Sequence, residues 1–351
     1  MLSGDSRPSH YPVNGSRITT QVVITPSFSA CDIENGGYVA LKILVAQLPE
    51  STAKLHIPRH ITETAPTEAA SHVTRLLDEF EHHASNGVHE CLVFEHMGPS
   101  VNSMVEELPQ FKPRMFGMKQ SLEALAFLHR NGIAHGDFQP GNILFTLKDL
   151  NSTPEEVLRQ EENVEAESIS PPVQRLDGKQ DKWAPRPPEK PVTPLGLRAP
   201  ELILTGAVNN TLDIWSFGCL IFELITGEPL FCVPGSEYED DDHLLSLTER
   251  LGALPDDLFM HWKTSSLYFT PERKLFNCQI GGVGPEEEPL LVDQVSMEEQ
   301  FDSTEPDIDS KEADEVKGLI RWILQYDSAK RPSPAEILSH PWFRNIDVGR
   351  V

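Results

Sequence analysis

Long apolar runs are missing from this chain. No stretch of about 18 consecutive apolar residues occurs, so the sequence predicts no membrane-spanning helix. The first residues, Met1–Pro12, are polar and lack the apolar core of a secretory signal. Cysteine is scarce too, and the five cysteines show no C-x-x-C spacing, so neither a disulfide framework nor a zinc site is expected. These absences predict a protein of the cytoplasm, the nucleus or both.

Basic residues are few relative to acidic ones. The chain has 29 Lys and Arg against 54 Asp and Glu, which gives a net charge of -25. Such a charge opposes direct nucleic-acid binding and favours basic protein partners. A solvated acidic surface without a specific partner would have the same composition. At 351 residues the chain is long enough for a full core, arranged as one large domain or two lobes.

One polar segment has the residue types of a catalytic loop. His135-Gly136-Asp137-Phe138-Gln139-Pro140-Gly141-Asn142 stands directly before the apolar run Ile143-Leu144-Phe145. A carboxylate such as Asp137 can accept the proton of an attacking hydroxyl, and an amide oxygen such as that of Asn142 can bind a magnesium ion on the phosphates of ATP. An ordinary loop could carry the same residues by chance, so the surrounding sequence has to decide.

Apolar periodicity predicts a strand-rich first part and a helical second part. The expected strands are 21–25, 38–45 and 91–95, with a turn or strand at 72–80. The expected helices are 116–129, 213–227, 243–251, 257–262, 313–324 and 333–339, with Gly132 as the stop of the first. Residues 147–191 are rich in Pro and acidic residues, which predicts an insert without a core of its own, and residues 280–312 are expected to be a second loop region.

Further motifs follow in a fixed order around this loop. Val39-Ala40-Leu41-Lys42 lies upstream, and Leu197-Arg198-Ala199-Pro200-Glu201, Asp213 and Arg331 lie downstream. In this combination the chain resembles the eukaryotic protein kinases over residues 32–345, and among them it is similar to the SR-protein kinases and their fungal relatives. The resemblance implies an α+β, bilobal fold, with a small, incomplete, β-rich N-lobe and a larger helical C-lobe.

The resemblance implies a role for each matching residue. Asp137 would be the catalytic base, and Lys42 would contact the α- and β-phosphates of ATP. The backbone of Glu95 and Met97 would bind adenine, with Phe94 behind the base. Asn142 and Asp177 would be the Mg²⁺ ligands. Glu201, Asp213 and Arg331 would be structural, with Glu201 paired to Arg331 and Asp213 tied to the catalytic-loop backbone.

The resemblance also implies domain limits, a reaction and a partner. Residues 1–31 would be an irregular N-terminal segment, 32–98 the N-lobe and 99–345 the C-lobe carrying the insert. The enzyme would be a non-specific serine/threonine protein kinase that uses ATP and Mg²⁺, with protein substrates of a basic, Arg/Ser-rich kind. Asp240-Asp241-Asp242 would belong to an acidic docking surface. Gly136, where many kinases have arginine, implies constitutive activity.

Three features of the family pattern are absent from this sequence. No G-x-G-x-x-G occurs upstream of Val39. Lys54 falls where a helix glutamate should pair with Lys42, and the nearby Pro58 would break that helix. Asp-Phe-Gly is also absent.

The nearest substitutes for the missing residues are weak matches. Glu50, Glu63 or Glu68 could replace the helix glutamate, and Leu176-Asp177-Gly178 is the closest approach to Asp-Phe-Gly. Two alternatives to an active kinase therefore stay open. One is a catalytically inactive pseudokinase that keeps the fold as a protein-interaction module. The other is an incomplete gene model of an active enzyme.

Overall fold

The computed structural model describes residues 18–20, 27–32, 37–44, 57, 59–61, 70–84, 87–107, 116–146, 173–174, 180–181, 193–233, 238–284 and 286–344. Its internal contacts divide the chain into two units. The first holds residues 1–99, 144–190 and 351, and the second holds residues 100–143 and 191–350. The domain limits 1–31, 32–98 and 99–345 stay a prediction. No helix among the described residues combines the length and apolarity that a membrane crossing requires.

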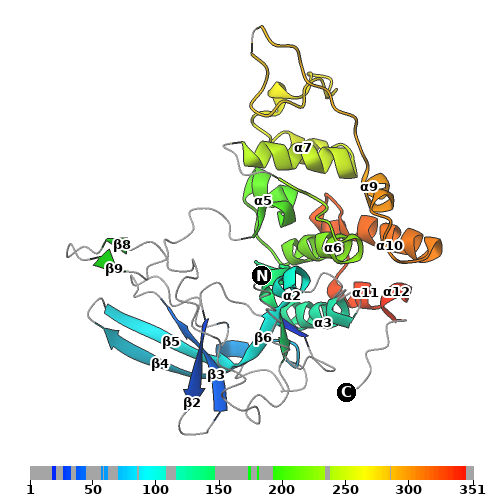
Figure 1. Ribbon diagram of the computed structural model, residues 1–351. Coiled ribbons are helices and arrows are strands. Elements are labelled where there is room, and N and C mark those ends of the chain that lie inside the picture. The colour runs from blue at the N-terminus through cyan, green and yellow to red at the C-terminus, as the bar shows by residue number, and fades with distance from the viewer. Residues whose placement is uncertain are drawn as a thin grey trace, which may run out of the picture. The chain divides into compact units, whose positions relative to one another are not determined.

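The first unit is built on a four-stranded antiparallel sheet with the order β2-β3-β5-β4 (Figure 1). Its strands are β2 (Ser27–Asp32), β3 (Gly37–Ile43), β4 (Leu76–Ala84) and β5 (Gly87–Glu95). Leu76, Leu92 and Phe94 form the buried core on this sheet, and Ala40 and Leu44 pack against it. The strands expected at 38–45 and 91–95 are thus confirmed, and residues 72–80 contribute the start of β4.

Two smaller sheets are present as well. One has the order β1-β7-β6, from β1 (Ile18–Thr20), β7 (Ile143–Thr146) and β6 (Met97–Ser100). The other is the antiparallel pair β8 (Val173–Gln174) and β9 (Gln180–Asp181), inside the segment expected to be an insert. The strand expected at 21–25 lies outside the described residues.

The second unit is helical, as the periodicity predicts. Its elements are α2 (Val101–Glu107), α3 (Phe116–Arg130), η1 (Pro140–Asn142), η3 (Leu195–Leu197), α5 (Pro200–Thr205), α6 (Thr211–Thr226), α7 (Glu239–Leu251), α8 (Asp256–Phe259), η4 (Ser265–Leu267), α9 (Met297–Ser303), α10 (Ser310–Ile323), η5 (Ser328–Lys330), α11 (Pro334–Leu338) and α12 (Pro341–Arg344). Helices α3, α5, α6, α7 and α10 supply most of the packed layers of this unit (Figure 1).

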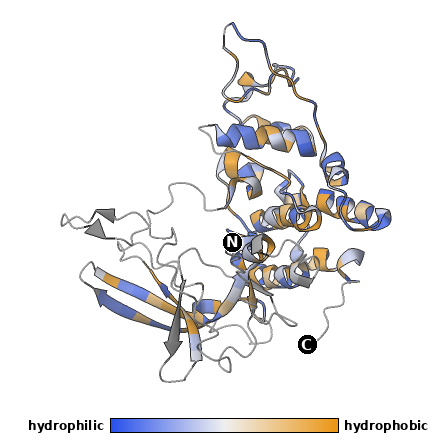
Figure 2. Cartoon of the chain, viewed as in Figure 1, coloured by the Kyte–Doolittle hydropathy of each residue, from blue (hydrophilic) through white to orange (hydrophobic). Residues whose placement is uncertain are grey.

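Helix α6 is the core of the second unit. Most of its residues are buried, and Trp215, Phe217 and Phe222 are 0% exposed, which matches its almost entirely apolar sequence (Figure 2). Gly218 allows helix α10 to approach closely, because a Cβ there would lie 2.7 Å from side-chain atoms of Ile323. An apolar helix buried on all sides can hold polar residues at its start in fixed positions, since its neighbours fix its rotation and depth.

Helices α2, α5, α9 and α12 are not among the expected helices, and α9 lies in a segment expected to be a loop. Residues 280–312 are expected to be loop, but Ser296 caps a helix in a capping box in which its side chain accepts from Glu299 N and the Glu299 side chain accepts from Ser296 N. The Ser-x-x-Glu spacing was the available signal. Helix α8 is also shorter than expected: it ends at Phe259, and Trp262 instead packs its indole beside Tyr268.

Candidate active site

The polar loop that carries Asp137 starts at a fixed helix end. Helix α3 closes in a Schellman motif: Ile133 N donates to Leu128 O and Gly132 N donates to His129 O, both at 3.0 Å. Gly132 has a φ of +70°, a left-handed conformation that glycine adopts without a Cβ penalty. The predicted stop at Gly132 is confirmed, and it turns the chain directly into His135 and Gly136.

Asp213, in the first turn of α6, holds the beginning of this loop. Its carboxylate accepts hydrogen bonds from the backbone N–H groups of His135 and Gly136, each at 2.8 Å. The ring Nε2 of His129, from α3, lies 2.8 Å from the same carboxylate. Asp213 is 1% exposed, so its carboxylate has lost its hydrogen bonds to water. The hydrogen bonds to these partners compensate for that loss. His129 is not singled out by the sequence, because a lone histidine near a helix end carries no distinctive pattern.

The two residues expected to carry the chemistry contact each other. Asn142 Nδ2 donates to the Oδ2 atom of Asp137 at 2.7 Å and to the main-chain O of Asp137 at 2.8 Å. The Oδ1 atom of Asp137 accepts from Gln139 Nε2 at 2.6 Å. Asp137 is only 5% exposed. Gln139 is a second residue whose part in the site could not be read from the sequence.

The geometry of Asn142 suits a metal ligand. Both donors of its amide group are engaged with Asp137, and within the described part of the chain its Oδ1 accepts no hydrogen bond. An amide oxygen of this kind is a normal ligand for a hard divalent cation. The described residues contain no cluster of three or more His, Cys, Asp or Glu that could hold a metal by itself. Asp177, the expected second ligand, lies outside the described residues.

The segment before α5 reaches the same loop. The Thr193 hydroxyl donates to Gly136 O at 2.8 Å, and Arg198 Nε donates to Thr193 O at 2.9 Å. Arg198 also lies 3.7 Å from Asp240 of α7. Residues far apart in the sequence thus fix both peptide groups of Gly136, since Asp213 accepts from its N–H and Thr193 donates to its carbonyl.

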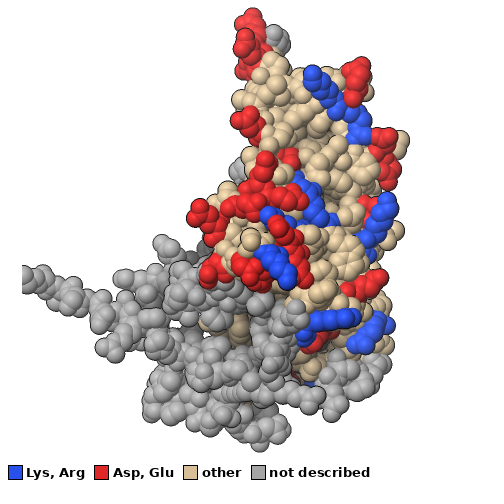
Figure 3. All heavy atoms as spheres, turned by 90° about the vertical axis from the view of Figure 1, so that its right-hand side faces the viewer, with Lys and Arg blue, Asp and Glu red and all other residues tan. Residues whose placement is uncertain are grey.

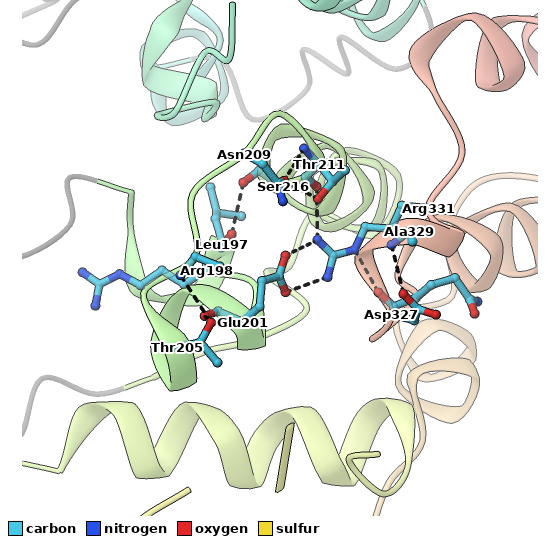
Figure 4. Close-up of polar contacts among 12 residues, drawn as sticks. Leu197, Arg198, Glu201, Thr205, Asn209, Thr211, Ser216, Asp327, Ala329 and Arg331 are labelled. Carbon is cyan, nitrogen blue, oxygen red and sulfur yellow. Dashed lines mark hydrogen bonds and ion pairs between the residues drawn. The ribbon is translucent and has the colours of Figure 1, made fainter. Parts of the chain in front are cut away.

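Glu201 and Arg331 form a bidentate ion pair in the second unit (Figure 4). The two guanidinium–carboxylate distances are 2.6 and 2.8 Å. Arg331 also donates to Gln325 O and Thr211 O, and its guanidinium carbon lies 4.8 Å from the centre of the Trp215 ring. The pair therefore joins α5, α6 and the η5 turn at one buried point.

The remaining described site residues lie in the first unit. Lys42 is on β3, opposite Leu92 of β5, and is 1% exposed. Glu95 ends β5 and its side chain is exposed, whereas Met97 begins β6 and is half-buried. Phe94, a core residue of β5, is 2% exposed. The proposed helix-glutamate substitutes Glu50, Glu63 and Glu68, together with Lys54 and Pro58, lie outside the described residues.

The prediction that Asp240-Asp241-Asp242 form a docking surface is wrong for Asp241. This residue is 8% exposed, and its carboxylate accepts from Trp262 Nε1, Thr264 Oγ1 and Tyr268 OH at 2.7, 2.5 and 3.0 Å. Burial, together with this carboxylate, raises the pKa of Tyr268 to about 12. The middle residue of the acidic run is therefore a structural acceptor inside the fold, since a pattern of charge alone does not reveal which side of a helix is covered.

A pocket of ≈ 220 Å³ lies beside η1. Val101, Asn102 and Val105 of α2, Pro140 of η1, residues 223–227 at the end of α6 and residues 304–307 line it. Glu223 is half-buried in its wall, and burial raises the pKa of its carboxyl group above the ordinary value. Glu305 and Asp307 also line this pocket, and both are exposed. The cavity therefore combines apolar walls with acidic groups.

Comparison with known proteins identifies the family. The chain matches the protein kinase domain over residues 24–159 and 175–343. The chain therefore belongs to the protein kinase family. It is 29% identical to the serine/threonine-protein kinase SRPK of Physarum polycephalum over 367 residues, which cover 90% of this chain and 82% of that protein.

Other relatives are longer than this chain. Identity to the dual specificity protein kinase CLK1 of Homo sapiens is 27%, over 88% of this chain and 60% of the relative. Identity to the serine/threonine-protein kinase Doa of Drosophila melanogaster is 26%, over 90% of this chain and 37% of the relative. The predicted resemblance to the SR-protein kinases and the α+β kinase fold is confirmed.

Proposed function

We propose that this chain is a serine/threonine protein kinase that transfers the γ-phosphoryl group of ATP to a protein hydroxyl. The observation that most supports this proposal is the hydrogen bond from Asn142 to Asp137, in a loop whose beginning is held by Asp213. In this family, catalysis consists mainly of positioning and charge stabilisation. A preorganised carboxylate next to an amide oxygen that accepts no hydrogen bond from the described residues supplies two of the parts that this catalysis needs.

Each site residue has a proposed task. Asp137 accepts the proton of the attacking hydroxyl. Asn142 presents its amide oxygen to a divalent metal, which we take to be Mg²⁺, and Asp177 is the proposed second ligand. When bound, the metal neutralises charge on the phosphates of ATP. Lys42 contacts the α- and β-phosphates.

The nucleotide base has a separate place in this proposal. The backbone groups of Glu95 and Met97 bind adenine. The buried Phe94 side chain supports the strand from which Glu95 extends. We further propose that the protein works in the cytoplasm, the nucleus or both.

Replacement of the catalytic base tests the reaction. Asp137→Asn keeps the shape of the side chain but removes the proton acceptor, so phosphoryl transfer to a Ser-containing peptide should fall by roughly 10²-fold to 10⁴-fold. ATP affinity, measured by titration calorimetry, should stay within about 2-fold, because the base does not bind the nucleotide. Asp257→Asn, at an exposed position of α8, is the control and should leave transfer unchanged. Equal turnover of Asp137→Asn and the unmodified chain would refute the assignment.

A binding-only function is the second candidate. It is favoured by one observation on the sequence, the lack of G-x-G-x-x-G upstream of Val39, because backbone amides of such a loop normally cover the phosphates. A thermal-shift titration with Mg-ATP, run beside the transfer assay, separates the candidates. A shift together with transfer supports the enzyme, whereas absence of both supports the pseudokinase or an incomplete gene model.

We also propose that the protein substrate is basic and rich in Arg and Ser. The support is chemical: the net charge is -25, and the pocket beside η1 has Glu223, Glu305 and Asp307 in its walls. Figure 3 shows one face of the chain, on which Asp and Glu are interspersed with Lys and Arg. An arginine side chain matches this pocket, because its stem can lie on Val101 and Val105 while its guanidinium group meets a carboxylate.

Peptide kinetics test the substrate proposal. Glu223→Gln should raise KM for an Arg-Ser peptide by roughly 10-fold, the usual loss of a partly buried charge-assisted hydrogen bond. KM for ATP should not change. Glu286→Gln, at an exposed position away from the pocket, is the matched control. Equal KM values for the two variants would contradict a role of this pocket in substrate binding.

A further inference from the structure

Glu305 lies in the wall of the pocket beside η1 and has an unusual backbone conformation. Its φ is +46°, and Arg273 is the other non-glycine residue with a positive φ among those that the structure describes. The Cβ atom of an L-residue is strained in this region. Pro306 follows, and the residue before a proline normally keeps an extended backbone. Glu305 is therefore disfavoured in its conformation for two separate reasons.

The end of helix α9 needs a residue with positive φ, but glycine would meet that need without strain. The helix ends at Ser303, and Thr304 is its C-cap. Glu305 N then donates to Asp302 O at 3.2 Å. Glycine is the usual residue just after a helix C-cap. Other helices of this chain do end in a turn that contains a glycine with positive φ: Gly132 after α3, Gly206 after α5, Gly227 after α6 and Gly252 after α7. Glutamate at the end of α9 thus lowers the stability relative to glycine.

The side chain of Glu305 does not offset this strain by a contact inside the described part of the chain. It is exposed, and its carboxylate takes part in no hydrogen bond or ion pair with the described residues. It does line the pocket of ≈ 220 Å³, together with Glu223 of α6 and with Val101 and Val105 of α2. Strained residues that persist in a fold cluster at sites that hold a ligand. The conformation and the position of Glu305 therefore point to a ligand in this pocket.

Two carboxylates from different elements suit a guanidinium group better than an ammonium group. Glu223 belongs to α6, and Glu305 belongs to the turn after α9. A guanidinium group presents five N–H donors in a rigid plane, so it can donate to two carboxylates at once. An ammonium group is a compact and strongly hydrated charge without this planar fork. The pocket should therefore bind arginine more tightly than lysine.

We propose that Glu305 is a specificity-determining residue of this pocket, which together with Glu223 receives the guanidinium group of a substrate arginine and discriminates arginine from lysine. This proposal rests on the substrate class proposed above. The strained backbone keeps the Glu305 carboxylate at the pocket wall. Removal of the side chain should therefore weaken peptide binding and stabilise the fold at the same time.

Peptide binding tests the assignment without any phosphoryl transfer. A fluorescein-labelled Arg-Ser peptide and its Lys-Ser counterpart are titrated with the full chain, and binding is followed by fluorescence anisotropy. The unmodified chain should bind the arginine peptide roughly 5-fold to 10-fold more tightly than the lysine peptide. In Glu305→Gln this preference should fall below about 2-fold, because one of the two charged acceptors is lost. Glu288→Gln, at an exposed position outside the pocket, is the control and should keep the preference.

Thermal unfolding tests the strain. Glu305→Gly should raise the melting temperature by about 1–3 °C, because glycine adopts a positive φ without strain. The same variant should bind the arginine peptide as weakly as Glu305→Gln does. Glu288 has no positive φ, so Glu288→Gly is the matched control and should lower the melting temperature or leave it unchanged.

Two results would overturn the proposal. One is an equal preference for arginine in Glu305→Gln and the unmodified chain, or no such preference in either. The other is a melting temperature of Glu305→Gly below that of Glu288→Gly. If the unmodified chain transfers no phosphate but loses its arginine preference in Glu305→Gln, the kinase proposal fails and the role of Glu305 in peptide binding stands.

Discussion

At the scale of single residues, Gly136 shows how a backbone requirement enters the site. Its φ is +78°, its N–H donates to Asp213 and its carbonyl accepts from Thr193. Glycine takes this conformation without strain, whereas any other L-residue is strained in it. In this chain, glycine at position 136 therefore meets a requirement of the backbone conformation, whereas space for a side chain does not limit the position.

Gly136→Ala should destabilise the chain by about 1–2 kcal/mol, because a Cβ in the left-handed region is strained even though no heavy atom lies within 4 Å of it. Gly318→Ala is the matched control: Gly318 is exposed in helix α10 and equally open, so alanine there should stabilise by about 1 kcal/mol. Urea unfolding measures both. A stability change of the same sign in the two variants would contradict the strain argument.

Glu223 gives the second residue-scale prediction, through its raised pKa. The folded state holds the proton more tightly than the unfolded chain does. The stability that this proton contributes is present below the unfolded pKa and is lost as the pH rises through the folded pKa. Glu223→Gln should thus gain stability relative to the unmodified chain between pH 5 and pH 8, measured as the difference in melting temperature at each pH.

Folding favours the protonated form of Glu223, whereas the proposed substrate contact needs the charged form. Only the charged carboxylate attracts an arginine side chain, so KM for an Arg-Ser peptide should rise as the pH falls through the raised pKa of Glu223. In Glu223→Gln this part of the pH dependence should vanish. If the variant shows no gain in stability at pH 8 and the same pH profile of KM, Glu223 has no special role in the pocket.

At the scale of secondary-structure elements, Glu201 and Arg331 join parts of the chain that lie 130 residues apart in sequence. The side chains are 9% and 0% exposed, so removal of one partner leaves a buried charge uncompensated. Glu201→Ala should cost about 3–5 kcal/mol in the free energy of unfolding. The double variant Glu201→Ala with Arg331→Met should cost less than the sum of the single changes.

A surface ion pair is the control for this double-mutant cycle at positions 201 and 331. Asp302 is 59% exposed in its side chain and lies 2.8 Å from Lys317, so Asp302→Ala should cost less than about 1 kcal/mol. Chemical denaturation of all variants gives the comparison. Strict additivity of the two changes at positions 201 and 331 would show that the pair contributes no coupling between α5 and the η5 turn.

At the scale of the whole molecule, the net charge of -25 is the dominant feature. Excess negative charge destabilises a compact state by self-repulsion, and salt screens that repulsion. The melting temperature should therefore rise by about 2 °C or more between roughly 0.02 and 0.5 M NaCl. A double variant, Glu286→Gln with Glu288→Gln, lowers the charge at two exposed positions and should show a smaller rise. A melting temperature that falls with salt would mean that attractive ion pairs outweigh the repulsion.

Much of the fold could be predicted because apolar periodicity and cap residues act over a few residues only. The strands around Lys42 and Glu95, the helix that stops before Gly132 and the apolar helix that begins at Thr211 all follow from such local rules. Helix α9 escapes prediction although Ser296 and Glu299 form a capping box, because its acidic, Pro-containing surroundings suggest a loop. Asp137 and Asn142, the residues proposed to carry the chemistry, are predicted from their spacing together with the motifs around them.

The sequence by itself determined the family, the order of its motifs and the residue types in the catalytic loop. Only the tertiary structure decided which side chains meet: His129 with Asp213, Thr193 with Gly136, and Gln139 with Asp137. It also placed Asp241 inside the fold instead of on a docking surface. The physical reason is that local sequence sets backbone conformation, whereas burial and long-range partners depend on how whole helices pack against one another.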